Sequence, residues 1–522
     1  MRSKAIEHVV IVGGGSAGWL SAALLAAAHQ TSTGPALKVT LIESPEVAPV
    51  GVGEGTWPSM RDTLRRIGVS ESDFFRSCDA AFKQGSLFVG WADGSADDAY
   101  FHPFVLPQGY GEADLSASWQ RQHSAVPFAD LVSFQPHLCR AGKAPKQATT
   151  PEFAAVANYG YHLDAGKFSL FLQRHCIETL GVIHVQDHVQ EVIAQQDGPY
   201  SGDIASVQTR QHGAIAGDLF IDCSGSHSLL LGKHFGVPLL SQKHILFNDR
   251  AYAVQLAYPT PDSPIASQTT STAQASGWIW DIGLPTRRGI GHVYSSTHIS
   301  DYDAEQTLLA YVERTGNGAA MLTTPRKLSF EPGYRAKFWH RNCIAIGQAA
   351  GFIEPLEASA LAMVELSATM LADGMPANRA VMDIVASRFN DAFTYRWERV
   401  IDFLKLHYLL SRRDGAYWQD NRAPESVPAR LRDALALWRT QPPSRYDFHR
   451  IEEVFPSASY QYVLYGMGLL PESDGKIRLS EHAELADGYF REAAALTRKM
   501  LAGLPGNREL IAHIVRHGMS AK

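Results

Sequence analysis

The carboxylate of Glu357 lies where the sequence predicts the start of a helix, and a charged group in that position could take part in chemistry. Residues 344–363 begin as an apolar strand, break at glycines and Pro355, and restart as an Ala/Leu/Met-rich helical pattern with Glu357 at its start. A turn between a strand and a helix directs unpaired backbone N–H groups at whatever lies above it, which suits an anion or an electron-rich carbonyl. The helix dipole also stabilises a carboxylate there. Glu357 is therefore either a functional group or an ordinary charged residue of a first turn.

A glycine-rich turn near the N-terminus indicates a bound dinucleotide. Residues 8–12 predict a strand buried on both faces, residues 19–28 a helix, and residues 38–43 a second strand that ends in Glu43. Between the first strand and the helix stands a GxGxxG turn, made of Gly13, Gly15, Ser16, Ala17 and Gly18. In this context the glycines form the tight turn, the helix start binds the pyrophosphate, and the acid binds a ribose hydroxyl.

Further glycine turns favour FAD over a nicotinamide cofactor. The second predicted strand leads into a glycine-rich loop that contains Val52 and Gly53. Residues 217–225 predict another strand with a small-residue turn at its end, and Gly347 marks a third such turn. Glycine turns this far apart in the chain suggest one extended cofactor that crosses several strand ends.

The composition excludes several classes of protein. The 522 residues are 45% hydrophobic and 19% charged, as in ordinary globular proteins. A net charge of −6, without a Lys/Arg block interleaved with aromatic residues, predicts no nucleic-acid partner. Five scattered cysteines predict reduced thiols, no metal site and a cytoplasmic enzyme. Because no uninterrupted apolar run reaches roughly eighteen residues, no membrane span is expected.

The rest of the chain predicts strands, a cleft and a helical region. Alternating patterns over 181–192 and 204–211 predict strands. Residues 277–282 and 289–294 predict a hairpin with Trp278 and Trp280 on one face. From about residue 358 the pattern is mostly helical, with breaks near 412–428 and 440–446.

The chain resembles the flavin-dependent tryptophan halogenase family from about Val9 to Ala368. The motifs that carry the resemblance are Gly13–Trp19, Gly51–Pro58, Phe82–Gly85, Tyr100–Phe104, Trp278–Ile282 and Phe352–Glu357. The resemblance implies an α/β fold: an FAD-binding, Rossmann-like fold of the GR2 or PHBH type, a mixed-sheet substrate region and a mostly helical C-terminal part. We expect an FAD module over 1–370, interleaved with cleft segments at about 85–170 and 245–300, and a helical region over 371–522 that completes the pocket.

The resemblance also implies a chemistry. FADH2 from a separate reductase, O2 and chloride or bromide yield hypohalous acid, which passes through an internal tunnel to an aromatic substrate. Lys83 receives this oxidant as a haloamine or as a hydrogen-bond donor, and Glu357 orients it or removes a proton from the substrate. Backbone N–H groups of Ser359 and Ala360 hold the halide, although the family's usual Ser-Thr-Gly is Ala-Ser-Ala here. Gly347 and Phe352 join the cofactor site.

The substrate side is implied by four aromatic residues. His102 and Phe104 match positions that line the pocket, and Trp278 and Trp280 match a motif that keeps the substrate from the flavin. That motif departs from the family pattern at Gly283, where proline is usual. A buried histidine or a pair of tryptophans is more often simple core packing, and one lysine among many is usually a solvated side chain. We expect indole or a related aromatic, rather than strictly free tryptophan, as the substrate.

Two other functions fit the same motifs. A single-component FAD-dependent aromatic monooxygenase would need NADPH and no Lys83, but the chain shows no second nucleotide fingerprint. A non-catalytic flavin-binding protein would bind FAD without turnover. A homodimer is compatible with each of these functions.

Overall fold

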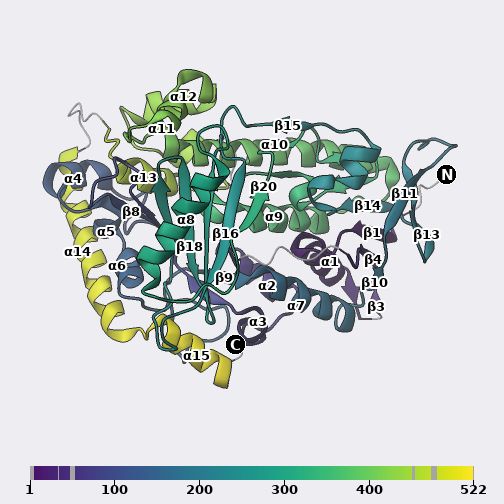
Figure 1. Ribbon diagram of the computed structural model, residues 1–522, viewed down its shortest axis with the longest axis horizontal. Coiled ribbons are helices and arrows are strands. Elements are labelled where there is room, and N and C mark those ends of the chain that lie inside the picture. The colour runs from purple at the N-terminus through teal and green to yellow at the C-terminus, as the bar shows by residue number, and fades with distance from the viewer. Residues whose placement is uncertain (1–4, 33, 47–52, 449–452, 472–478, 521–522) are drawn as a thin grey trace. The chain divides into compact units, whose positions relative to one another are not determined.

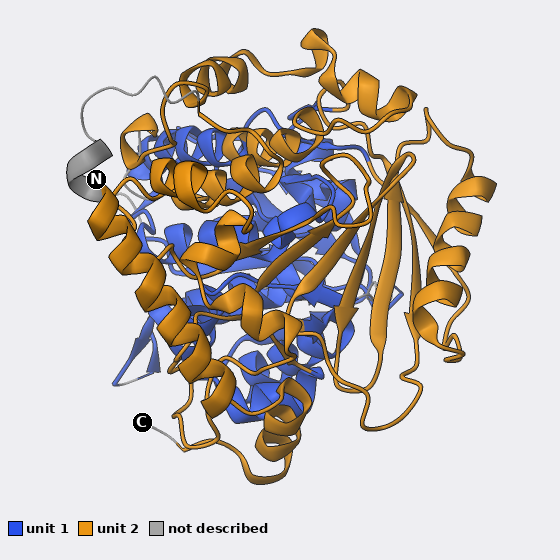
Figure 2. Cartoon of the chain, turned by 90° about the vertical axis from the view of Figure 1, so that its left-hand side faces the viewer, with its two compact units in different colours: residues 1–79, 163–242, 331–397 blue, residues 80–162, 243–330, 398–522 orange. Residues whose placement is uncertain are grey.

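The computed structural model describes residues 5–32, 34–46, 53–448, 453–471 and 479–520. The chain forms two compact units, each made of three segments (Figure 2). Unit 1 comprises residues 1–79, 163–242 and 331–397, and unit 2 comprises residues 80–162, 243–330 and 398–522. The predicted division at residue 370 concerns which segments bind the cofactor, and it stays a prediction.

Unit 1 is built on a six-stranded sheet with the order β10-β4-β1-β14-β23-β22. All neighbouring strands are parallel except the edge pair β22 and β23. The strands are β1 (His8–Val12), β4 (Lys38–Glu43), β10 (Ile183–Gln186), β14 (Leu219–Asp222), β22 (Trp339–His340) and β23 (Cys343–Ala345). The predicted α/β class and the first two strands are confirmed.

The helices of unit 1 cover this sheet. They are α1 (Ser16–Ala28), α2 (Met60–Arg66), α3 (Glu71–Cys78), α7 (Ala165–Glu178), α9 (Ser359–Asp373) and the first part of α10 (Arg379–Leu409). Helix α1 packs on β4, α7 and α9, which explains why its Ala/Leu sequence is apolar nearly all round (Figure 1). Small antiparallel sheets complete unit 1: β2 (Gln30–Thr31) with β3 (Gly34–Pro35), β11 (Val189–Ala194) with β12 (Ile204–Thr209) and β13 (Gly213–Ala216), and β15 (Leu239–Ser241) with β21 (Gly333–Arg335) and β24 (Gly351–Phe352). A short strand, β5 (Gly53–Gly55), precedes α2.

Unit 2 is built on a seven-stranded sheet with the order β20-β16-β19-β18-β17-β7-β8. Its strands are β7 (Gly85–Val89), β8 (Ala99–Pro103), β16 (Arg250–Leu256), β17 (Thr269–Gln274), β18 (Gly277–Gly283), β19 (Arg288–Tyr294) and β20 (Arg326–Ser329). The predicted hairpin of β18 and β19 is confirmed, with Trp280 opposite Gly291. Helix α8 (Asp301–Gly316) covers one face, where Ile279, Ile290 and Leu308 share a buried core.

The other elements of unit 2 are mostly helical. They are β6 (Ala81–Lys83), α4 (Leu115–Gln122), α5 (Phe128–Val132), α6 (Gln135–Arg140), β9 (Gly160–Asp164), α11 (Ala416–Arg422), α12 (Ala429–Trp438), α13 (Ser457–Gly466), α14 (Leu479–Gly503) and α15 (Asn507–His517). The predicted helical C-terminal region is confirmed, although α11 lies inside the predicted break at 412–428. The strand predicted over 181–192 is two strands, because Asp187 accepts backbone N–H bonds from Gln211 and His212 where β10 ends.

Candidate functional site

The glycine turns of unit 1 converge at the carboxyl ends of adjacent strands. Strand β1 pairs in parallel with β14, and β14 with β23, so the turns that follow these strands lie side by side. A Cβ built on Gly347 would stand 2.6 Å from the Cβ of Ala17, which places that turn against the start of α1. The predicted glycine turns therefore lie together at one edge of the sheet, and their binding of one extended cofactor stays a prediction. Val52, another predicted cofactor residue, lies outside the described residues.

Gly13 and Gly18 leave no room for a side chain within the protein, whereas Gly15 borders open space. A Cβ on Gly13 would stand 2.1 Å from the Cys223 carbonyl oxygen, and one on Gly18 would stand 1.9 Å from the Gly13 carbonyl oxygen. A Cβ on Gly15 would meet no atom within 4 Å. Gly15 precedes α1 without a side-chain cap, so the first N–H groups of the helix face open space. This cradle fits a cofactor pyrophosphate.

Glu43 lies directly over this turn. A Cβ on Gly14 would stand 2.2 Å from the carboxyl carbon of Glu43. One carboxylate oxygen, Oε2, accepts hydrogen bonds from Gln173 Nε2 at 2.9 Å and from the His184 ring at 3.0 Å. These two partners orient the carboxylate at the end of β4, as a ribose-binding acid requires.

The turn before α9 is a strained part of unit 1. Glu357 has φ 63° and Ala358 has φ 56°, so two consecutive residues with side chains adopt the left-handed conformation. Each such residue costs roughly 1–2 kcal/mol, and non-glycine strain of this kind clusters at functional sites. Glu357 is 6% exposed. Helix α9 starts at Ser359 without a side-chain cap, and a helix start of this kind suits an anion.

The segment 57–66 runs along this turn and helix α9. Trp57 Nε1 donates to the Glu357 carbonyl oxygen at 2.7 Å. Ser59 and Thr63 donate to the carboxyl group of Glu365, at 3.3 and 2.5 Å. Further along, Arg66 pairs with Asp373. The glycine loop motif thus continues into a segment, residues 57–66, that is bonded to the turn at Glu357 and to α9 at Glu365 and Asp373; we call this segment the strap.

Glu365 is a buried acid that sequence reasoning missed. It is 3% exposed, and burial raises its pKa from the ordinary 4.5 to about 8. At neutral pH this carboxyl group is therefore mostly protonated. The sequence signal for a buried acid was a glutamate on an apolar helical stretch, eight residues after Glu357. Its partners Ser59 and Thr63 are too remote in sequence to be recognised from the pattern.

Lys83 lies in unit 2 on the short strand β6 and is 1% exposed. Strand β6 pairs antiparallel with β9, and the residue opposite Lys83 is Gly160. A glycine opposite the lysine leaves room beside its side chain. Lys83 Nζ lies 5.4 Å from the centre of the Phe104 ring, a contact that stabilises a positive charge. The reading of Lys83 as a solvated surface lysine is wrong.

His162 shares the face of Lys83 on this ladder. It lies opposite Ala81, two residues before Lys83, so the two side chains point to the same side. Its Nε2 lies 2.8 Å from Thr269 Oγ1, and among the described residues its Nδ1 has no hydrogen-bond partner. Burial, and secondarily the Lys83 charge, holds the pKa of His162 well below its ordinary value. The imidazole therefore stays neutral beside the lysine.

The two predicted pocket residues at the end of β8 have different surroundings. Phe104 follows β8, and its N–H donates to the carbonyl oxygen of Gln84, the neighbour of Lys83, at 3.2 Å. His102 is 5% exposed and lies 2.8 Å from Ser459 Oγ, with the Tyr462 ring nearby. Phe104 therefore adjoins the lysine directly, whereas His102 is held by α13.

The two tryptophans of β18 are not equivalent. Trp278 is 1% exposed and lies 6.3 Å from the centre of the Trp91 ring, within the aromatic core of unit 2. Trp280 is half-buried and covers Gly291, where an added Cβ would stand 2.1 Å from its indole ring. Core packing accounts for Trp278, and Trp280 is the better candidate for a residue that faces a ligand.

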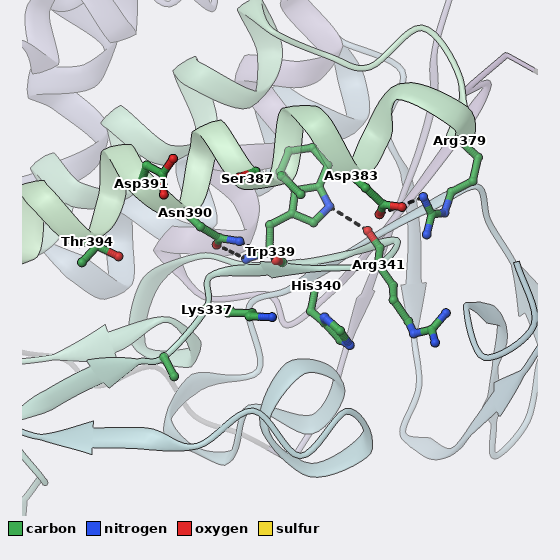
Figure 3. Close-up of a pocket in the computed structure, with 12 residues that line it drawn as sticks. Lys337, Trp339, His340, Arg341, Arg379, Asp383, Ser387, Asn390, Asp391 and Thr394 are labelled. Carbon is green, nitrogen blue, oxygen red and sulfur yellow. Dashed lines mark hydrogen bonds and ion pairs between the residues drawn. The ribbon is translucent and has the colours of Figure 1, made fainter.

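A separate pocket of about 640 Å³ lies in unit 1 between β22 and α10 (Figure 3). Most of its charged groups are paired: Arg379 with Asp203 and Asp383, and Arg341 with Asp203. Trp339 Nε1 donates to the Arg341 carbonyl oxygen at 3.0 Å. None of the predicted site residues lines this pocket.

Within the described ranges, no group of three or more His, Cys, Asp or Glu side chains could hold a metal ion. No helix within those ranges has the length and apolar character to cross a membrane.

Comparisons with known proteins agree with this geometry. The family model described as tryptophan halogenase matches residues 8–480. The 7-chloro-L-tryptophan 6-halogenase KtzR of Kutzneria sp. (strain 744) is 31% identical, over 97% of this chain and 99% of its own length. The crystal structure of a tryptophan halogenase from Shewanella frigidimarina is 49% identical with a TM-score of 0.94, over 99% of each chain. Xcc4156, a flavin-dependent halogenase from Xanthomonas campestris, is 31% identical with a TM-score of 0.85, also over 99% of each.

The fold and these similarities place the protein among the flavin-dependent halogenases. The chain belongs to the tryptophan halogenase family. It is an oxidoreductase that uses FADH2, O2 and halide, and its reduced flavin comes from a separate reductase.

Proposed function

We propose that this enzyme halogenates an electron-rich aromatic such as indole or a tryptophan derivative, with Lys83 and Glu357 as its catalytic residues. The observation that carries the proposal is the buried Lys83 on β6, with Gly160 opposite it and Phe104 beside it. An ammonium group enclosed in this way, rather than solvated, is suited to act on a small oxidant.

The cofactor region of unit 1 supports the first half of the reaction. The bound reduced flavin supplies, with O2 and halide, hypohalous acid. The turn at Gly13–Gly18, Glu43, Gly53, Gly347 and Phe352 would hold the flavin, and the N–H groups of Ser359 and Ala360 would hold the halide. Glu357, next to these donors, takes up the proton that the aromatic ring loses.

Lys83 acts in the second half of the reaction. Its ammonium donates a hydrogen bond to the oxygen of hypohalous acid and polarises the O–X bond, so that the aromatic carbon attacks the halogen. The oxygen leaves as water with a proton from Lys83. Glu357 then releases the ring proton to solvent and Lys83 regains one from solvent, so the net change is replacement of a ring hydrogen by halogen, with water as the second product. The Phe104 contact and the neutral His162 favour this charged form of Lys83 over a haloamine.

The helical segment beside β8 bears on the choice of substrate. Helix α13 contacts β8, and Tyr462 on this helix donates to the Val105 carbonyl oxygen at 3.1 Å. The helix contains no acidic residue that could bind an α-ammonium group. We therefore favour indole-like substrates, with His102, Phe104 and Trp280 as contacts and Trp278 as support behind them.

Mass spectrometry tests this proposal directly. Indole and tryptophan are incubated with the enzyme, a flavin reductase, NADH, FAD and bromide or chloride. We expect a product that gains one halogen and loses one hydrogen. A product that gains one oxygen would instead identify a monooxygenase, and FAD binding without turnover of any aromatic would identify a non-catalytic protein.

The cellular setting is also a proposal. All five cysteines are free and buried, which supports a reducing compartment such as the cytoplasm. The homodimer stays a prediction that analytical ultracentrifugation would test.

A further inference from the structure

We propose that Trp57 is a positioning residue that holds the Glu357–Ala358 turn in its left-handed conformation and so sets the halide site at the start of α9. This inference rests on the roles proposed above for Glu357, Ser359 and Ala360. It adds a residue that acts through the backbone and touches neither halide nor oxidant.

The hydrogen-bond geometry supports this role. The indole N–H of Trp57 donates to the Glu357 carbonyl oxygen at 2.7 Å, across 300 positions of sequence. The Ala358 N–H donates to the Pro355 carbonyl oxygen at 3.0 Å. Glu357 and Ala358 share the peptide unit between these two bonds. Its oxygen and its N–H are therefore both fixed, and this unit leads directly into α9.

The strain explains why such a bond is needed. Neither Glu357 nor Ala358 is a glycine or an asparagine, so nothing in their own chemistry favours a positive φ. Such a conformation persists only when the surrounding structure holds it in place. Rotation of this peptide unit would turn the Glu357 side chain and move the first N–H groups of α9.

The strap that contains Trp57 is bound to helix α9. Ser59 and Thr63 bind the buried carboxyl group of Glu365, and Arg66 pairs with Asp373. The indole therefore reaches the turn from a segment fixed against the helix that the turn begins. Loss of the Trp57 N–H should loosen the turn while leaving the strap in place.

The test is Trp57→Phe, which keeps an aromatic ring and removes the N–H donor. We expect the KM for bromide to rise about tenfold, which corresponds to ~1.4 kcal/mol, with a smaller change in kcat. A second readout needs no turnover: titration of the flavin-free protein with bromide, followed by its thermal shift, should show affinity weakened by the same factor. Trp57→Tyr gives a second version of the test if the phenylalanine variant does not fold.

Trp339→Phe is the matched control. Trp339 also donates its indole N–H to the carbonyl oxygen of a left-handed residue in unit 1, since Arg341 has φ 55° (Figure 3). This variant should leave the bromide KM unchanged. An unchanged bromide KM and affinity in Trp57→Phe, or equal losses in both variants, would overturn the inference. Glu357→Gln, measured in parallel, separates the two levels: if it keeps full turnover, the catalytic role proposed for Glu357 fails, whereas the role of Trp57 is still decided by the bromide KM and affinity.

Discussion

The turn before α9 in unit 1 and strand β6 in unit 2 present their functional groups in opposite ways. In unit 1 the proposed donors are backbone N–H groups that follow two left-handed residues, and the Trp57 indole N–H donates to the first of these residues. In unit 2 the donor is the side chain of Lys83, placed by a regular strand ladder opposite a glycine. Backbone donors depend on conformation, and a side-chain donor depends on residue type.

This difference predicts which substitutions each region tolerates. Unit 1 should be sensitive to any added Cβ or lost hydrogen bond that changes its turns. The lysine region should tolerate changes in its surroundings but not in the amine itself. The predictions below test this contrast, beginning with the largest expected effect.

Gly18→Ala should abolish flavin binding. The new Cβ would stand 1.9 Å from the Gly13 carbonyl oxygen, so the turn between β1 and α1 must open. We expect no detectable FAD binding by fluorescence titration, together with a lower melting temperature. Tight FAD binding in this variant would show that the turn is not the cofactor cradle.

Glu357→Gln should slow halogenation by roughly 10²-fold, the size expected for a positioned acid–base group. Product formation is measured by chromatography at saturating bromide. Glu365→Gln is the control, because it changes an acid of the same region that we place outside the chemistry, and it should retain most of the activity. Turnover near wild type in Glu357→Gln would remove the carboxylate from the mechanism.

Gly15→Ala should weaken FAD binding by about tenfold, because the second glycine of the fingerprint lets the cofactor approach the backbone. The flavin-free protein should melt normally, since Gly15 has an ordinary φ of −76° and the new Cβ meets no protein atom within 4 Å. The pair Gly15→Ala and Gly18→Ala thus separates a clash with ligand from a clash with protein. Unchanged affinity would show that the cofactor does not approach this residue.

Glu365→Gln should flatten the dependence of stability on pH. The pKa of Glu365 rises from 4.5 to about 8 on folding, so the folded protein binds this proton more tightly than the unfolded chain. The stabilisation is complete below pH 4.5 and is lost as the pH rises through 8. Between pH 6 and 9 the wild-type melting temperature should fall by roughly 2–5 °C more than that of the variant. Parallel melting curves would show that Glu365 is already ionised at pH 6.

Local patterns predicted the elements of this protein better than the contacts between them. The strand–glycine–helix order placed Gly13 and Gly15 between β1 and α1 correctly, because strand burial and turn chemistry are local properties, whereas Gly18 lies inside α1. The helical pattern after Pro355 likewise predicted α9. Helix α1, however, begins at Ser16 rather than Trp19, since its first turn needs no apolar face.

The missed features depend on residues that are distant in sequence. The left-handed pair Glu357–Ala358 carries no glycine or asparagine that would signal it, and its support comes from Trp57. Glu365 and His162 became candidates only when the fold buried them beside partners from other segments. Trp278 looked equivalent to Trp280 on the strand, but only the fold shows that Trp91 packs against it.

The most direct test of the central claim is one reaction in which FADH2 oxidation and brominated indole are followed together, for wild type and Lys83→Ala. We predict that flavin oxidation, with release of hydrogen peroxide, continues within about twofold while brominated indole disappears. Lys146→Met is the control: Lys146 is another buried lysine of unit 2, and it donates to Pro151 and Tyr159. It should keep the ratio of product to flavin oxidised. Brominated indole from Lys83→Ala at the wild-type rate would contradict the account.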